Sequence, residues 1–349
     1  MDKRISRKIY IYSFVMSMVI VLYHFNIDYI YGVNISYRGM FEEQLFSYWK
    51  SCLDGLASLS VGYFFVSSAF LLYYNLTEDN FRQKIIRRCK SLVIPYVAWN
   101  SISYVVEFLI NGSFPQIDGK VDLIDRLFLN PFDGPLWFMF VLLLFLIVSP
   151  ILLKLRNYPR ILWAGVAILY VLALVFSMFG YCKIFPYYVS WFERFFRYAP
   201  IYFSGAVVGL LHPEWVFENK VEKHGKYILG VYLILLALAV LNVNMYLTWC
   251  IFEIAPMLVW FAFDKDKFQR TVSGRYKISF MLYAAHWVVI RVAQVMLQYR
   301  IGGMGVVVNC YIGIGMQVIS AIIVYFIIML FDKLMRYMPK LHGILAGYR

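Results

Sequence analysis

The stretch FRQKIIRRCKSLVIPYVAWNSISYVVEFLI, residues 81–110, decides the fold because it places a dense basic cluster directly before an apolar run. A helix needs about 20 apolar residues to cross the roughly 30 Å core of a bilayer. Cytoplasmic gaps between such helices collect Lys and Arg. Residues 91–110 have the length and character of a span. The stretch therefore predicts a membrane-spanning helix that starts at a cytoplasmic surface.

The same pattern recurs along the whole chain, and the gaps between apolar runs alternate between basic and non-basic. The gaps on one side, together with the two ends of the chain, carry 24 Lys and Arg residues, whereas the other side carries 8, one of which, Arg197, lies at the start of a predicted span. This bias predicts that both termini are cytoplasmic. The predicted spans number ten and cover roughly residues 9–27, 52–75, 91–110, 135–153, 161–180, 195–211, 227–243, 245–263, 278–298 and 305–332.

Composition supports the same fold class. Hydrophobic residues make up 62% of the chain, which leaves no room for a soluble domain of any size. The net charge of +13 would suggest a nucleic-acid partner in a soluble protein, but here the basic residues lie where membrane topology requires them. The five cysteines show no paired spacing, so neither a metal site nor a disulfide framework is expected. We predict an all-α, polytopic integral membrane protein with one domain over residues 1–349, whose partner is the bilayer and not nucleic acid.

Ionisable residues within the predicted spans are the best candidates for a functional site, because each costs about 2.5–3.5 kcal/mol to insert. His286 lies near the middle of its span, where a neutral imidazole can serve as a general base or make a helix–helix hydrogen bond. His24 lies towards the outer end of the first span and can also be an interfacial histidine that binds a carbonyl. Glu253 and Arg291 can form a structural pair, and Glu107 can extend to the outer surface.

The basic cluster of residues 81–90 also has two interpretations. It can serve membrane topology alone. However, Arg and Lys side chains held on a helix at a membrane surface also bind phosphate groups. Arg87, Arg88 and Lys90 are therefore candidates for binding a phosphate-bearing ligand.

Five segments, in order along the chain, resemble the membrane acyltransferase-3 family of bacterial surface-glycan O-acyltransferases. The matching segments are distributed over the predicted spans, and each of them is a short motif. The segments are VIVLYHF at 19–25, FFVSSAFLL at 64–72, RCKSLVIPYVAWN at 88–100, GPLWF at 134–138 with the Ser-Pro pair at 149–150, and SFMLYAAH at 279–286.

The resemblance implies transfer of an acyl group, most simply acetyl, from a cytoplasmic acyl-CoA to a hydroxyl of a cell-surface or lipid-linked glycan. It implies a multi-pass protein of the inner (plasma) membrane and no metal. His24 would be the general base, and the phosphates of acetyl-CoA or another acyl-CoA would rest on Arg87, Arg88 and Lys90. His286 would complete the catalytic site, and the acceptor would be bound by Trp137 and Glu253.

The sequence also departs from the family pattern. Ser13 stands eleven residues before His24, where the family usually has an arginine, and Ala69 replaces a glycine. Two other functions therefore remain open. One is a non-enzymatic exporter or flippase for a polyprenyl-linked glycan. The other is a degenerate relative of the family that has no enzymatic activity and acts only by interacting with other molecules. An enzyme would change the ester content of the glycan, whereas an exporter would change its amount at the surface.

The predicted topology can be tested by cysteine labelling. A cysteine introduced at Asp118 should react with a membrane-impermeant thiol reagent added outside the cell, because residues 111–134 form a predicted outer gap. A cysteine introduced at Lys223 should react only after permeabilisation. The reverse pattern would contradict the predicted orientation.

Overall fold

The computed structural model describes residues 3–25, 33–113, 115, 125–126, 131–179, 190–217, 225–241, 256, 274–301 and 306–347. The chain divides into two compact units, which are described separately. Unit 1 comprises Met1–Tyr12, Ser58–Leu92 and Phe138–Val272. Unit 2 comprises Ser13–Ala57, Val93–Trp137 and Ser273–Arg349.

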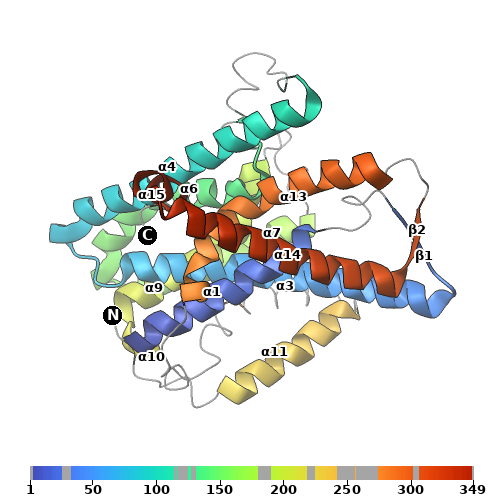
Figure 1. Ribbon diagram of the computed structural model, residues 1–349. Coiled ribbons are helices and arrows are strands. Elements are labelled where there is room, and N and C mark those ends of the chain that lie inside the picture. Colours follow the sequence, from blue (N-terminus) through green and yellow to red (C-terminus); the bar gives the residue numbers. More distant parts are fainter. Residues whose placement is uncertain are drawn as a thin grey trace. The chain divides into compact units, whose positions relative to one another are not determined.

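Helices dominate the described part of the chain (Figure 1). In chain order its elements are α1 (Lys3–His24), β1 (Asn34–Ser36), α3 (Met40–Tyr73), α4 (Glu78–Asn111), the 3-10 helix η2 (Gly134–Leu136), α6 (Trp137–Lys154), η3 (Leu155–Asn157), α7 (Pro159–Phe179), α9 (Ser190–Leu211), α10 (Glu214–Phe217), α11 (Gly225–Val240), η6 (Gly274–Ile278), α13 (Ser279–Ile301), β2 (Val307–Asn309), α14 (Cys310–Met335) and α15 (Pro339–Ala346).

The prediction of an all-α, multi-pass membrane protein is confirmed at this level. Within the described residues, 7 helices are long and apolar enough to cross a membrane. Each coincides with a predicted span. They cover Lys3–His24, Met40–Tyr73, Glu78–Asn111, Gly134–Asn157, Pro159–Phe176, Tyr276–Leu297 and Cys310–Met335.

The remaining three predicted spans are not settled. Helix α9 covers the predicted span 195–211, and α11, with 16 residues, covers most of 227–243. The predicted span 245–263 lies outside the described residues, apart from Pro256. The count of ten spans and the cytoplasmic location of the termini therefore stay predictions.

Helix α4 begins well before its predicted span, and local capping explains why. The backbone N–H of Asn80 donates to Thr77 Oγ1 at 3.4 Å, and the backbone N–H of Thr77 donates to Asn80 Oδ1 at 3.0 Å. This reciprocal pair satisfies N–H groups that the first turn leaves free. Glu78 and Asp79 in that turn also complement the helix dipole. The basic cluster and the following apolar run thus lie on one helix of 34 residues.

In the Ser149-Pro150 pair near the end of α6, the serine satisfies a backbone carbonyl that the proline leaves without a hydrogen bond. Pro150 has no N–H, so it cannot bond to the carbonyl of Leu146 four residues earlier. The Ser149 hydroxyl donates to that carbonyl instead, at 2.6 Å. A proline is tolerated in a membrane helix when such a side chain satisfies the freed group.

Unit 1 is held by close helix approach and by aromatic packing. A Cβ atom at Gly205 in α9 would lie 2.4 Å from the carbonyl oxygen of Val66 in α3, so only glycine permits this approach. Nearby, the Phe65 ring stacks on Tyr198 with centroids 4.8 Å apart, and Phe145 stacks on Tyr202 at 4.4 Å. Small residues at the crossing and large rings beside it are typical of helix packing in membranes.

Unit 2 is linked by polar contacts between helices that are distant in sequence. Gln317 of α14 accepts a hydrogen bond from Trp49 Nε1 at 2.8 Å and donates to the carbonyl of Leu22 at 2.9 Å. The Ser17 hydroxyl of α1 donates to the carbonyl of Ser279, the first residue of α13, at 3.1 Å. These bonds fix α1 beside the helix that carries His286.

A small parallel sheet in unit 2 was not predicted. Asn34, Ile35 and Ser36 of β1 pair with residues 307–309 of β2. Each strand has only three residues, which is too short for an alternating pattern to stand out in sequence.

Candidate functional site

His286 lies on α13 and is fully buried. Its Nδ1 atom is 2.6 Å from the carbonyl oxygen of Tyr283 and 3.2 Å from that of Leu282. A carbonyl oxygen only accepts hydrogen bonds, so Nδ1 must carry the proton. The neutral ring then keeps its lone pair on Nε2, which has no hydrogen-bond partner among the described residues. The backbone thus fixes the tautomer in which Nε2 is the basic atom.

His24 lies beside His286, which the sequence alone could not show. The two imidazole centroids are 5.2 Å apart, and the ring planes are inclined by 33°. The indole of Trp287 lies edge-on to His24 with centroids 5.6 Å apart. His24 is the last residue of α1 and is only half-buried, whereas His286 is enclosed. The structure therefore brings the two predicted catalytic histidines together, with His24 the more accessible.

The turn before α6 packs against the same part of α13. Tyr283 donates its hydroxyl to the carbonyl of Pro135 at 2.5 Å. A Cβ atom on Gly134 would lie 3.7 Å from the Trp287 ring, which is ordinary contact. Trp137 follows this turn as the first residue of α6 and is half-buried. The motif GPLWF is thus anchored to the helix that carries His286.

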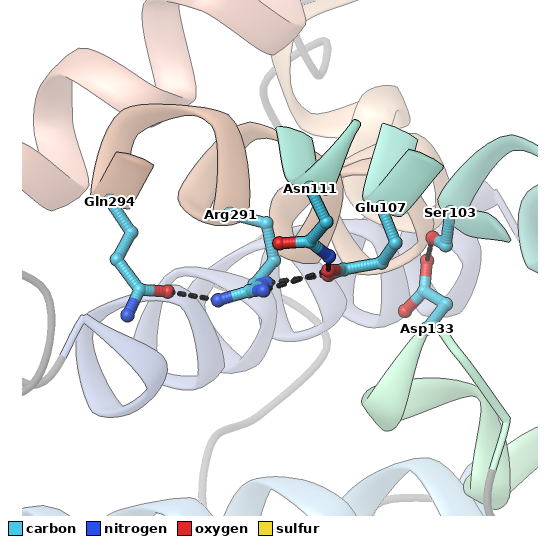
Figure 2. Close-up of polar contacts among 6 residues, drawn as sticks. All are labelled: Ser103, Glu107, Asn111, Asp133, Arg291 and Gln294. Atoms are coloured by element: carbon cyan, nitrogen blue, oxygen red, sulfur yellow. Dashed lines mark hydrogen bonds and ion pairs between the residues drawn. The ribbon is translucent and has the colours of Figure 1, made fainter. Parts of the chain in front are cut away.

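Arg291 forms a paired network with Glu107, as Figure 2 shows. Its Nε donates to Glu107 Oε1 at 2.7 Å, and Nη2 donates to Oε2 at 2.9 Å. Nη1 donates to Gln294 Oε1 at 2.5 Å, while Asn111 Nδ2 donates to Glu107 Oε2 at 3.2 Å. The sequence suggested Glu253 as the partner of Arg291 and a solvent-directed Glu107. The carboxylate that holds Arg291 is instead that of Glu107, and Glu253 lies outside the described residues.

A second buried carboxyl lies next to this network. Asp133 is fully buried, and its carboxyl group accepts a hydrogen bond from the Ser103 hydroxyl at 3.3 Å (Figure 2). Burial raises the pKa of Asp133 well above its ordinary value, and the bond from Ser103 offsets this only in part. Asp133 was not singled out from the sequence, because it lies in the predicted outer gap of residues 111–134 and not within a predicted span. Ser103, Glu107 and Asn111 are four residues apart, so they lie on one face of α4. This polar face could have indicated from the sequence that α4 binds polar partners such as Asp133.

The predicted phosphate-binding residues lie in unit 1, where they separate into two groups. Arg87 and Lys90 are exposed. Arg88 is half-buried, and its Nη2 atom donates to the Ser68 hydroxyl of α3. Two of the motif segments, RCKSLVIPYVAWN and FFVSSAFLL, therefore meet through Arg88 and Ser68. The three basic residues do not share one face of α4.

Within the part of the chain that the structure describes, no three His, Cys, Asp or Glu side chains lie close enough to hold a metal ion.

Comparison with protein families identifies the chain. The model of the acyltransferase-3 family, described as an acyltransferase domain, matches residues 14–333. The match includes the motif residues of both units, so the chain belongs to this family. Its membership supports acyl transfer as the general activity of a multi-pass membrane protein. No curated protein and no solved structure matches the chain.

The Glu107–Arg291 pair should contribute measurably to stability. The two side chains are 17% and 19% exposed, so Glu107→Ala would leave a largely buried guanidinium without its carboxylate. We expect a loss of about 1.5–3 kcal/mol, measured by thermal or denaturant unfolding of the purified protein in detergent. The Glu107→Ala, Arg291→Met double variant should recover part of the loss.

The exposed carboxylate Glu43 provides the control, and Glu43→Ala should leave stability within about 0.5 kcal/mol of the original. Equal effects of Glu43→Ala and Glu107→Ala would contradict a stabilising role for the pair.

Proposed function

We propose that this protein transfers an acyl group, most simply acetyl, from a cytoplasmic acyl-CoA to a hydroxyl of a cell-surface or lipid-linked glycan, as a multi-pass enzyme of the inner (plasma) membrane. Family membership supports acyl transfer in general. The observation that carries the proposal is the pair of adjacent imidazoles, one of which has its tautomer fixed by the backbone.

The chemistry requires a base at the acceptor. The glycan hydroxyl oxygen attacks the thioester carbonyl carbon, a new C–O ester bond forms, and the C–S bond breaks. The hydroxyl proton passes to the base, and the CoA sulfur leaves as a thiolate that takes up a proton. A hydroxyl is almost entirely protonated near pH 7, so a positioned histidine typically contributes about 10²–10⁴-fold to such a step.

The different burial of the two histidines suggests a division of roles. His24 is half-buried and can meet an incoming hydroxyl, so we assign it as the general base. His286 is enclosed and held by the carbonyl of Tyr283, so we assign it to the site beside His24, where its Nε2 atom can accept or orient a proton. We assign Trp137 and Glu253 to binding of the glycan acceptor.

The acyl donor is assigned to the basic start of α4. Arg87 and Lys90 are exposed and free to move towards phosphates, and Arg88 is fixed by Ser68. Guanidinium groups bind phosphates through paired hydrogen bonds, and a lysine adds a point charge.

The assignment of the histidines is tested by substitution. His24→Ala should lower glycan acylation at least about 100-fold because the base is lost, and His286→Ala should strongly reduce it. The readout is the O-acyl content of surface polysaccharide by solution NMR, in a deletion strain that carries each variant at equal protein level.

His212 is the matched control, because it lies at the end of α9 in unit 1 and contacts Glu214 and Trp215. His212→Ala should keep normal O-acylation. If His24→Ala leaves the O-acyl content intact, the catalytic assignment is wrong and export of the glycan becomes the better function.

The donor assignment is tested by the double variant Arg87→Gln, Arg88→Gln. Loss of two phosphate-binding charges should raise the apparent KM for acyl-CoA about tenfold or more, since each charged hydrogen bond contributes about 1.5–3 kcal/mol. Acyl transfer in isolated membranes provides the measurement. Lys277→Gln, an exposed basic residue of another predicted cytoplasmic gap, is the control. An unchanged KM in a correctly inserted double variant would leave the cluster with a role in topology alone.

A further inference from the structure

The C-terminal part of unit 2, residues 333–341, carries an exposed surface that has no role in the function proposed above. It comprises the last turn of α14, a turn of three residues and the start of α15, as Figure 1 shows. The 26 residues of α14 form one of the helices that are long and apolar enough to cross a membrane. At 1.5 Å per residue they extend about 39 Å, more than the roughly 30 Å hydrocarbon core. This surface therefore lies where α14 reaches the lipid headgroups.

Contacts on the inner side of this surface fix its position. The buried Asp332 accepts hydrogen bonds from Nε and Nη2 of Arg336 at 3.0 and 2.7 Å, and its other carboxylate oxygen lies 3.0 Å from Nε2 of His342. Trp99 of α4 donates its indole N–H to the carbonyl of Leu345 at 3.1 Å. Helix α15 is thus held against α14 and α4, and the side chains that it leaves outside have a defined place.

The side chains on the outside are of two kinds, apolar and basic. Tyr337 is 79% exposed, Met338 47% and Leu341 40%. Lys333 and Lys340 are exposed beside them in the sequence. Large apolar side chains that gather on a surface mark an interaction site. Their combination with lysines is typical of a segment that lies in the interface of a membrane, where tyrosine is also enriched.

The charges of this surface favour an anionic headgroup. Asp332 pairs with Arg336, although the Arg336 side chain is still 54% exposed. Lys333 and Lys340 form no ion pair within the part of the chain that the structure describes. The surface therefore keeps an excess of positive charge. Ammonium groups donate charge-assisted hydrogen bonds to phosphate oxygens, and a headgroup without a cation of its own leaves this attraction unopposed.

We propose that residues 333–341 bind the headgroups of anionic phospholipids, with the two lysines at the phosphates and the three apolar side chains in the interface below them. Membrane topology alone accounts for lysines at the end of a span. It predicts neither the exposed apolar side chains between these lysines nor a preference for one headgroup. The proposal depends neither on the proposed function nor on the direction in which the chain crosses the membrane.

Photocrosslinking at the surface itself provides the test. The full-length protein with Tyr337→p-benzoylphenylalanine is reconstituted in vesicles of equimolar phosphatidylglycerol and phosphatidylcholine and irradiated, and the captured lipids are quantified by mass spectrometry. Phosphatidylglycerol should be captured at least about fivefold more than phosphatidylcholine, because one lysine near an anionic surface contributes about 1 kcal/mol. The added double change Lys333→Gln, Lys340→Gln should bring the ratio back to about one.

Lys154 provides the matched control, because it is an exposed lysine at the end of another spanning helix, α6. Lys154→Gln should leave the ratio of captured lipids unchanged. All three lysines are exposed, so their exchange for glutamine should leave the fold intact. Equal capture of the two lipids, an equal loss of preference in Lys154→Gln, or crosslinking to a second copy of the chain in place of lipid would each contradict the proposal.

Discussion

The rest of this structure depends on one constraint: a polar group inside a bilayer has no water to bind, so the protein must supply its partner. The Glu107–Arg291 pair, the Ser149 hydroxyl on the carbonyl freed by Pro150, and the two bonds of Gln317 all meet this constraint. Each of these contacts links a polar side chain to a defined group, and several link helices that are far apart in sequence. In unit 2, the same bonds that satisfy buried polar groups therefore also fix the helices relative to one another.

This constraint makes buried polar atoms that lack a hydrogen-bond partner informative about function. Among the described residues, His286 Nε2 and Asp133 Oδ1 are two such atoms. A buried group that lacks a partner is costly to keep, and in a membrane protein such groups mark functional sites. For His286 this fits chemistry, because the backbone bond at Nδ1 leaves Nε2 basic and His24 lies beside it. The bond from Nδ1 to the Tyr283 carbonyl therefore decides which atom of the His286 ring could accept a proton.

The proposed site and the Glu107–Arg291 pair share one helix. Helix α13 carries His286, which lies beside His24, and Arg291, which binds Glu107 of α4. The pair thereby fixes the position of the helix that holds the proposed reactive imidazole. Precise positioning of this kind is a large part of catalysis, because it replaces the search of two free reactants. The polar network of Figure 2 then serves both stability and orientation.

The sequence by itself determined the fold class, the places of seven spanning helices and the family, and it singled out the two histidines as candidates. It could do so because the length of an apolar stretch and the charge between spans are local properties of the sequence. They do not depend on how the helices pack against one another. It could not determine the partner of Arg291, the proximity of His24 to His286, the tautomer of His286 or the separation of Arg88 from Arg87. Those features depend on which helix faces pack together. The same sequence pattern of apolar residues is compatible with many such pairings. Only the tertiary structure decided that the carboxylate of Glu107, on a distant part of the chain, holds Arg291.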